Sequence, residues 1–112
     1  MNENLEAVIG LLDLERLEDN LFRGQSHDIG APQVFGGQIL GQALSAAHRT
    51  VDKRRPHALH AFFLRPGDFH QPVIYQVERS RDGRSYSNRR VVAIQHGSPI
   101  LNLAASFHAG ED

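Results

Sequence analysis

Two histidines, His57 and His60, have a type and spacing that could do chemistry. The HxxH spacing brings two imidazoles together on a helix, but the surrounding letters HALHAFFLR are typical of a strand, where an odd offset sends the rings to opposite faces. The chain has no cysteine and no HExxH motif, so we expect neither a metal site nor a cofactor. His57 is a candidate catalytic residue lining a cleft, and a hydrogen-bonded core or interface histidine is the alternative.

A group of arginines around the turn Asp82-Gly83 is the second candidate. Guanidinium groups at this density suit phosphate recognition through paired hydrogen bonds, and a nearby tyrosine ring could stack on a base. A solvated hairpin whose charges discourage aggregation is the alternative. The arginines are Arg79, Arg81, Arg84, Arg89 and Arg90, and the tyrosines are Tyr75 and Tyr86.

The third candidate is the start of a predicted helix, at Phe35-Gly36-Gly37-Gln38. Unpaired backbone N–H groups and the positive end of the helix dipole would suit a developing oxyanion or a polarised carbonyl. The alternative is that the glycines only permit tight packing. Residues 36–51 contain no Asp or Glu, so this helix offers no obvious general base.

Length and charge limit the class of protein. With 112 residues and a net charge of -1, the chain fits one domain over residues 1–112 and carries no overall field that would attract nucleic acid. The absence of cysteine suits a reducing compartment, and no stretch has the roughly 20 apolar residues of a spanning helix. We therefore expect a cytoplasmic protein, or a peroxisomal one in a eukaryote, without nucleic-acid or membrane partners.

The elements that must position these residues follow from hydrophobic spacing. A short amphipathic helix begins near Asn2, a strand that is broken or bulged at Asp19-Asn20 follows, and residues 34–51 form a long helix covered on more than one side. Residues 57–65 are apolar on both faces, as in a central strand. Residues 73–80, 85–95 and 99–108 predict a three-strand antiparallel meander with turns at Asp82-Gly83 and His96-Gly97. The order predicts an α+β fold in which an antiparallel sheet curls around one helix.

Three segments together resemble the amino-terminal half of the acyl-CoA thioesterase II family. They contain FGGQ, FLRPGD and RDGRSYSNRRV, in that order, within a similarity that runs from about Leu5 to Ala109. The resemblance implies a hotdog fold, hydrolysis of fatty acyl-CoA to free acid and coenzyme A, and no metal. It also implies a protein of two hotdog domains, in which the water-activating Asp, Thr and Gln come from the second domain.

This chain departs from that pattern at two places. At the helix position where the second domain supplies its Asp, the chain has Gly37-Gln38, and where relatives often read SFQ, it has Ser106-Phe107-His108. The resemblance therefore implies a non-catalytic first hotdog. Its expected substrate-binding residues are Gly37 and Gln38 beside the thioester, Arg65, Arg84, Arg89 and Arg90 at the coenzyme A phosphates, and His57 in the cleft.

Two functions from different classes remain open. The first is the domain just described, which pairs with a second hotdog domain. The second is a stand-alone homodimeric module that binds acyl-CoA, or assembles, without turnover. An oligonucleotide-binding hairpin rests on the arginines alone and ranks last because the net charge is close to zero.

Overall fold

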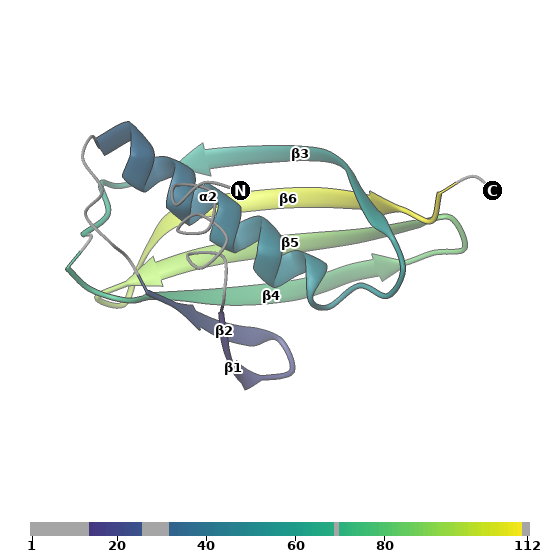
Figure 1. Cartoon of the computed structure of the whole chain (residues 1–112), viewed down its shortest axis with the longest axis horizontal. Helices are drawn as coiled ribbons and strands as arrows, with labels where there is room; N and C mark the ends of the chain where they lie inside the picture. The colour runs from purple at the N-terminus through teal and green to yellow at the C-terminus, as the bar shows by residue number, and fades with distance from the viewer. Residues whose placement is uncertain (1–13, 26–31, 69, 111–112) are drawn as a thin grey trace, which may run out of the picture.

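The computed structural model describes residues 14–25, 32–68 and 70–110, and in these ranges the side chains of residues 32–35 are not described. The described residues form a six-stranded antiparallel sheet in the order β1-β2-β4-β5-β6-β3, with one helix against it (Figure 1). The predicted amino-terminal helix lies outside the described residues. The elements are β1 (Glu15–Glu18), β2 (Leu21–Gly24), α2 (Pro32–His48), β3 (Arg55–Phe63), β4 (Val73–Asp82), β5 (Tyr86–Gln95) and β6 (Ser98–His108).

The meander β4-β5-β6 forms the centre of the sheet and confirms the prediction for residues 73–108. Its side chains alternate between the helix side and the outer face, which gives the apolar residues of the helix side a shared core. The turn between β5 and β6 has positive φ angles at His96 (52°) and Gly97 (74°), the geometry of a two-residue hairpin turn. The single first strand predicted to be broken or bulged at Asp19-Asn20 is instead two strands, β1 and β2, which form a small antiparallel hairpin with its turn at these residues.

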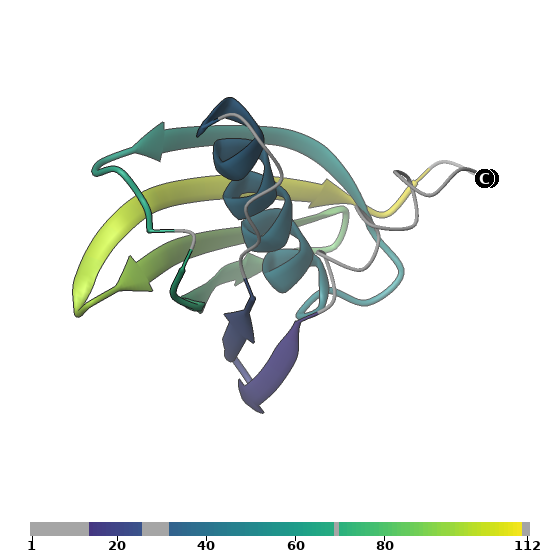
Figure 2. The same ribbon diagram turned by 60° about the vertical axis from the view of Figure 1, so that its left-hand side comes forward.

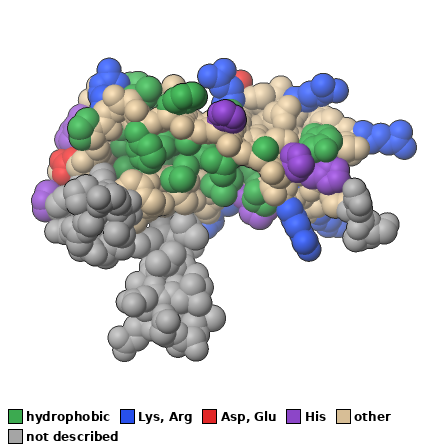
Figure 3. All heavy atoms as spheres, turned by 90° about the horizontal axis from the view of Figure 1, so that it is seen from above, with side chains coloured by type: hydrophobic (Ala, Val, Ile, Leu, Met, Phe, Trp, Pro, Cys, Tyr) green, Lys and Arg blue, Asp and Glu red, His purple; other side chains and the backbone are tan. Residues whose placement is uncertain are grey.

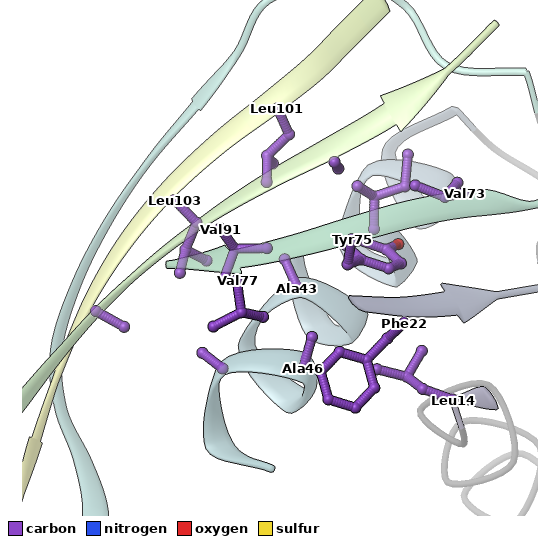
Figure 4. Close-up of a cluster of buried hydrophobic side chains, with 14 of the residues drawn as sticks. Leu14, Phe22, Ala43, Ala46, Val73, Tyr75, Val77, Val91, Leu101 and Leu103 are labelled. Carbon is purple, nitrogen blue, oxygen red and sulfur yellow. The ribbon is translucent and has the colours of Figure 1, made fainter. Parts of the chain in front are cut away.

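Helix α2 crosses the concave side of the curved sheet (Figure 2). Small residues on its core face, Ala43, Ala46 and Ala47, are fully buried and let the helix pack close to β4, β5 and β6 (Figure 4). On its polar stripe, Gln38 and Gln42 are also buried. The prediction of a helix covered on more than one side is therefore confirmed.

The buried amide of Gln42 explains how a polar stripe is accommodated. Its Nε2 donates to the carbonyl oxygen of Gln25 (2.8 Å), and its Oε1 accepts from the hydroxyl of Tyr75 (2.6 Å). Because an unsatisfied buried amide costs free energy, these bonds fix the helix against β2 and β4. Tyr75 is a core residue, and its burial raises the pKa of the hydroxyl above the ordinary range.

Gly24 is required where β2 passes this amide. A Cβ built at Gly24 would collide with the side chain of Gln42, whose Cδ would lie 2.8 Å away. We expect Gly24→Ala to lower the free energy of unfolding by about 1–3 kcal/mol, measured by urea denaturation. The control is Gly37→Ala, where a Cβ would meet no described atom within 4 Å; here alanine should be neutral or stabilising by about 0.5–1 kcal/mol. Equal effects of the two changes would contradict the close contact at Gly24.

The prediction that residues 57–65 form a central strand covered on both sides is wrong. Strand β3 pairs only with β6 in the described sheet, and all but one of its residues are exposed. Helix α2 lies over the meander and covers little of β3 beyond Ala61. An apolar strand needs a cover, but the sequence does not say that the same chain provides it.

Candidate functional site

The start of α2 differs from the predicted oxyanion site. The helix begins at Pro32, which has no N–H, so only N–H groups in its first turn lack helical carbonyl partners. The N–H groups of Gly36, Gly37 and Gln38 lie beyond this turn, so the prediction that they are unpaired is wrong. Tight packing does not explain Gly37 either, because it is exposed and a Cβ there would meet no described atom within 4 Å.

Arg65 lies at the same end of the sheet as the start of α2. Its Nη1 donates to the carbonyl oxygen of Pro99 (2.6 Å), which ties the loop after β3 to the beginning of β6. The same loop is held by buried Gln95, whose side chain accepts from the N–H of Asp68 and donates to the carbonyl oxygens of Asp68 and Gln71. A Cβ built at Gly36 would lie 3.6 Å from the ring of Phe63, so the end of β3 lies close to the helix here. The FLRPGD motif thus forms a firmly held loop beside the helix start.

Arg89 belongs to the interior. Its guanidinium is 1% exposed, and its Nε and Nη2 donate to the hydroxyl (2.7 Å) and carbonyl oxygen (3.0 Å) of Thr50. Nη2 also contacts Asp82 (2.8 Å), and Nη1 donates to the carbonyl oxygens of Arg81 and Asn88. With donors at all three nitrogens directed inward, Arg89 joins the segment after α2 to the β4–β5 hairpin. This buried guanidinium is not available to a phosphate group.

Asp82 and its neighbours complete this network, which we call the hairpin network: Thr50, Arg54, Asp82, Ser87 and Arg89. A hydrogen bond from the Ser87 hydroxyl (2.8 Å), followed by the contact with Arg89, lowers the pKa of Asp82. Arg54 donates to the Ser87 hydroxyl (3.0 Å) and to the carbonyl oxygen of Arg84 (3.1 Å). The carboxylate of Asp82 is therefore engaged with this network.

Arg84 and Arg90 remain exposed. Among the described residues, neither guanidinium forms a hydrogen bond or an ion pair, so both are available for a ligand. Arg84 lines a hollow of about 490 Å³ at the hairpin, and Arg90 lines a groove of about 440 Å³ on the outer face of the sheet, together with His60.

His57 lies in a cluster of aromatic rings that the sequence did not predict. Its ring contacts those of Tyr86 (centroids 5.5 Å apart) and His108 (6.0 Å), which contact each other (4.6 Å). Tyr86 and His108 face each other on neighbouring strands, on the face away from α2. A register shift between Pro56 and Ala58 interrupts the alternation of β3, so the odd spacing of His57 and His60 does not separate them onto opposite faces. Predicting this cluster would have required the register in which β3 and β5 pair with β6.

The expected site residues therefore form two groups at opposite ends of the sheet. Gly37, Gln38 and Arg65 lie where α2 begins. His57 and Arg84 lie at the other end, near the β4–β5 hairpin (Figure 1). Strand β5 has 10 residues, so at ~3.3 Å per residue the groups are roughly 30 Å apart. One chain does not gather them into one site.

The structure also limits other kinds of site. Within the described ranges, no group of three or more His, Asp or Glu side chains is arranged to hold a metal ion. No helix in this part of the chain is both long and apolar enough to cross a membrane.

An antiparallel sheet wrapped around one long helix defines a hotdog domain, and comparison with solved structures agrees. The chain is similar to acyl-CoA thioesterase II TesB2 from Mycobacterium marinum (45% identical, TM-score 0.85, covering 95% of this chain and 39% of that one). A hot dog fold protein of unknown function from Alicyclobacillus acidocaldarius, 24% identical, has the same fold (TM-score 0.81, covering 95% and 40%).

Comparison of sequences assigns the domain to a particular family. Residues 23–108 match the family described as "Acyl-CoA thioesterase N-terminal domain", and the chain belongs to this family. It is 48% identical to acyl-CoA thioesterase 2 of Haemophilus influenzae, over 99% of this chain and 39% of that protein. It is 49% identical to human acyl-coenzyme A thioesterase 8, over 93% of this chain and 33% of that protein. The chain thus spans well under half the length of these relatives.

Proposed function

We propose that this chain is the first, non-catalytic hotdog domain of an enzyme that hydrolyses fatty acyl-CoA to free fatty acid and coenzyme A. The observation that carries the proposal is the 48% identity with acyl-CoA thioesterase 2 over nearly the whole chain. Residues 36–51, which run from the second turn of α2 to just past its end at His48, contain no Asp or Glu that could activate a water. The activating groups then come from a second hotdog domain.

The second domain pairs with this one through β3. Large apolar side chains stand exposed on this edge and just after it: Leu59 (41%), Phe62 (66%), Phe63 (54%) and Leu64 (45%). In the view from above, hydrophobic side chains gather along the middle of the molecule (Figure 3). An edge strand with this much apolar surface is a template for a further strand, and a second hotdog supplies one.

Such pairing also brings together residues from both of the separated groups. Two similar domains that pair edge to edge are related by a two-fold axis, so their β3 strands run antiparallel. The hairpin end of this chain then meets the helix start of its partner. One composite site takes Arg84 from the hairpin end of this chain and the activating groups from the second domain, whereas His57 and Arg90 lie on the outer face of the sheet, opposite the helices. The other composite site contains Gly37, Gln38 and Arg65, and it accommodates a thioester without a carboxylate to hydrolyse it.

Release of free coenzyme A from acyl-CoA, followed with a thiol reagent, tests this assignment. In the protein with both hotdog domains, Arg84→Ala should lower kcat/KM roughly tenfold, because one charge-assisted phosphate contact is lost. Gly37→Leu should change turnover by no more than about twofold at unchanged stability. Loss of hydrolysis in Gly37→Leu would place the reacting thioester at the helix of this chain instead.

The homodimeric binding module is the second candidate, and the exposed β3 edge favours it equally. A dimer of this chain alone would have two identical helices without an acidic residue over 36–51. Calorimetry with acyl-CoA and light scattering separate the candidates. A stable dimer that binds acyl-CoA without releasing coenzyme A supports the module, whereas hydrolysis at the rate of intact relatives by this chain alone would contradict both.

A further inference from the structure

The ring cluster at the hairpin end has no role in the proposed hydrolysis. Tyr86 is 43% exposed, and its ring lies beside those of His57 and His108 with centroids 5.5 and 4.6 Å away. These rings lie on the outer face of the sheet, opposite α2, where they contribute nothing to the core. The rings are tilted to one another by 61° (His57 and Tyr86), 44° (His57 and His108) and 47° (Tyr86 and His108), so another planar ring can stack on the exposed Tyr86 ring while the imidazoles meet its edge.

A polar hollow adjoins the rings. It measures about 490 Å³, within the range of small-molecule sites, and it is lined by Arg81, Gly83, Arg84, Ser85, Tyr86 and Asn88. Tyr86 is thus shared between the ring cluster and the hollow. In Figure 3, histidine and arginine side chains gather at this end of the molecule.

The hollow is cationic, and its backbone is held in place. None of the described lining residues is acidic, and the nearby Asp82 carboxylate is engaged by Ser87 and Arg89. The guanidinium groups of Arg81 and Arg84 form no hydrogen bond or ion pair with the described residues, although Arg54 anchors the Arg84 carbonyl. The N–H of Gly83 also donates to the carbonyl oxygen of Tyr86 (2.7 Å), which closes the loop. Two cations are therefore presented on a fixed loop beside a stacking surface.

We infer that this site, formed by His57, Tyr86 and His108 with Arg81 and Arg84, binds the nucleotide end of acyl-CoA. The adenine ring stacks on Tyr86, the flanking imidazoles contact its edge, and the phosphate groups contact Arg81 and Arg84. The inference rests on the proposed function for the identity of the ligand. It adds a base-binding surface, contributed by the first hotdog, to a role that would otherwise be limited to phosphate contacts.

Calorimetric titration with adenosine 3′,5′-bisphosphate, which carries the base and the 3′-phosphate of coenzyme A, tests the site directly. The protein should bind the probe, and Tyr86→Ala and Arg84→Ala should each weaken binding roughly tenfold. Arg23→Ala is the matched control, since it removes an exposed arginine paired with Glu15 on the β1–β2 hairpin. Absence of binding, or equal binding by Tyr86→Ala and Arg23→Ala, would overturn the inference. Binding of 5′-ADP as tight as that of the bisphosphate would overturn the assignment to coenzyme A and identify a free-nucleotide site.

Comparison of acyl-CoA with the matching acyl-pantetheine separates this inference from the proposed function. Tyr86→Ala should lower kcat/KM for acyl-CoA roughly tenfold and leave the acyl-pantetheine reaction unchanged. Hydrolysis without binding of the bisphosphate would overturn the nucleotide site and keep the thioesterase. Tyr86-dependent binding of the bisphosphate without any hydrolysis would do the reverse.

Discussion

Arg89→Met is expected to lower the free energy of unfolding by roughly 3 kcal/mol, because it leaves buried hydrogen-bond acceptors without their donor. Methionine fills a similar volume but removes the donors that bond to Thr50 and contact Asp82. Thr50 is 8% exposed, so its hydroxyl and carbonyl would lose a buried donor without gaining water. Since domains of this size are stable by about 5–15 kcal/mol, the change is easily measured by urea denaturation.

Arg90 provides a matched control one residue away. Its side chain lies on the outer face and makes no hydrogen bond or ion pair with the described residues, so Arg90→Met should alter stability by no more than about 0.5 kcal/mol. If both variants unfold at the same urea concentration, the hairpin network does not stabilise the domain. Arg89→Lys should be intermediate, because one ammonium replaces a planar group that reaches several acceptors at once.

Phe62→Lys is expected to weaken association through β3 by about 2 kcal/mol, or roughly 30-fold in dissociation constant. Phe62 is 66% exposed, so its loss should change the stability of the domain itself little. The substitution removes an apolar side chain that the proposed interface would bury. Sedimentation equilibrium of this chain should show self-association in the wild type and a shift toward monomer in the variant.

Gln76→Lys is the control for the charge introduced. Gln76 is exposed on β4, which is separated from β3 by β5 and β6, so association should be unchanged. A wild-type chain that stays monomeric at high concentration would contradict pairing through this edge. Equal weakening by both variants would show that charge, and not loss of the β3 contact, drives the effect.

The proposed division of labour has a simple physical basis. Two similar domains related by a two-fold axis create two similar sites, but catalysis needs an activating carboxylate in only one. The other site is then free to lose that group, as the pair Gly37-Gln38 illustrates. Arg84 and the ring cluster would remain because substrate binding at the active composite site still uses them.

Much of the fold follows from the sequence because its signals are local. Alternation with period two specifies β4, β5 and β6, His96-Gly97 specifies the turn between β5 and β6, and the uncharged stripe of α2 specifies a helix covered on two sides. These patterns depend on the geometry of a single element, so they can be read before any partner element is known. The family motifs, recognised together, add the hotdog assignment.

The sites depend on what the tertiary structure brings together. Burial of Arg89, exposure of Arg84, and the meeting of His57, Tyr86 and His108 are set by strand register and by a shift between Pro56 and Ala58, which no local pattern reports. The place of β3 at the sheet edge is also a global property, because an apolar strand looks the same whether its cover comes from its own chain or from another. The sequence by itself determined which elements form, and only their packing decided which side chains remain available to a ligand.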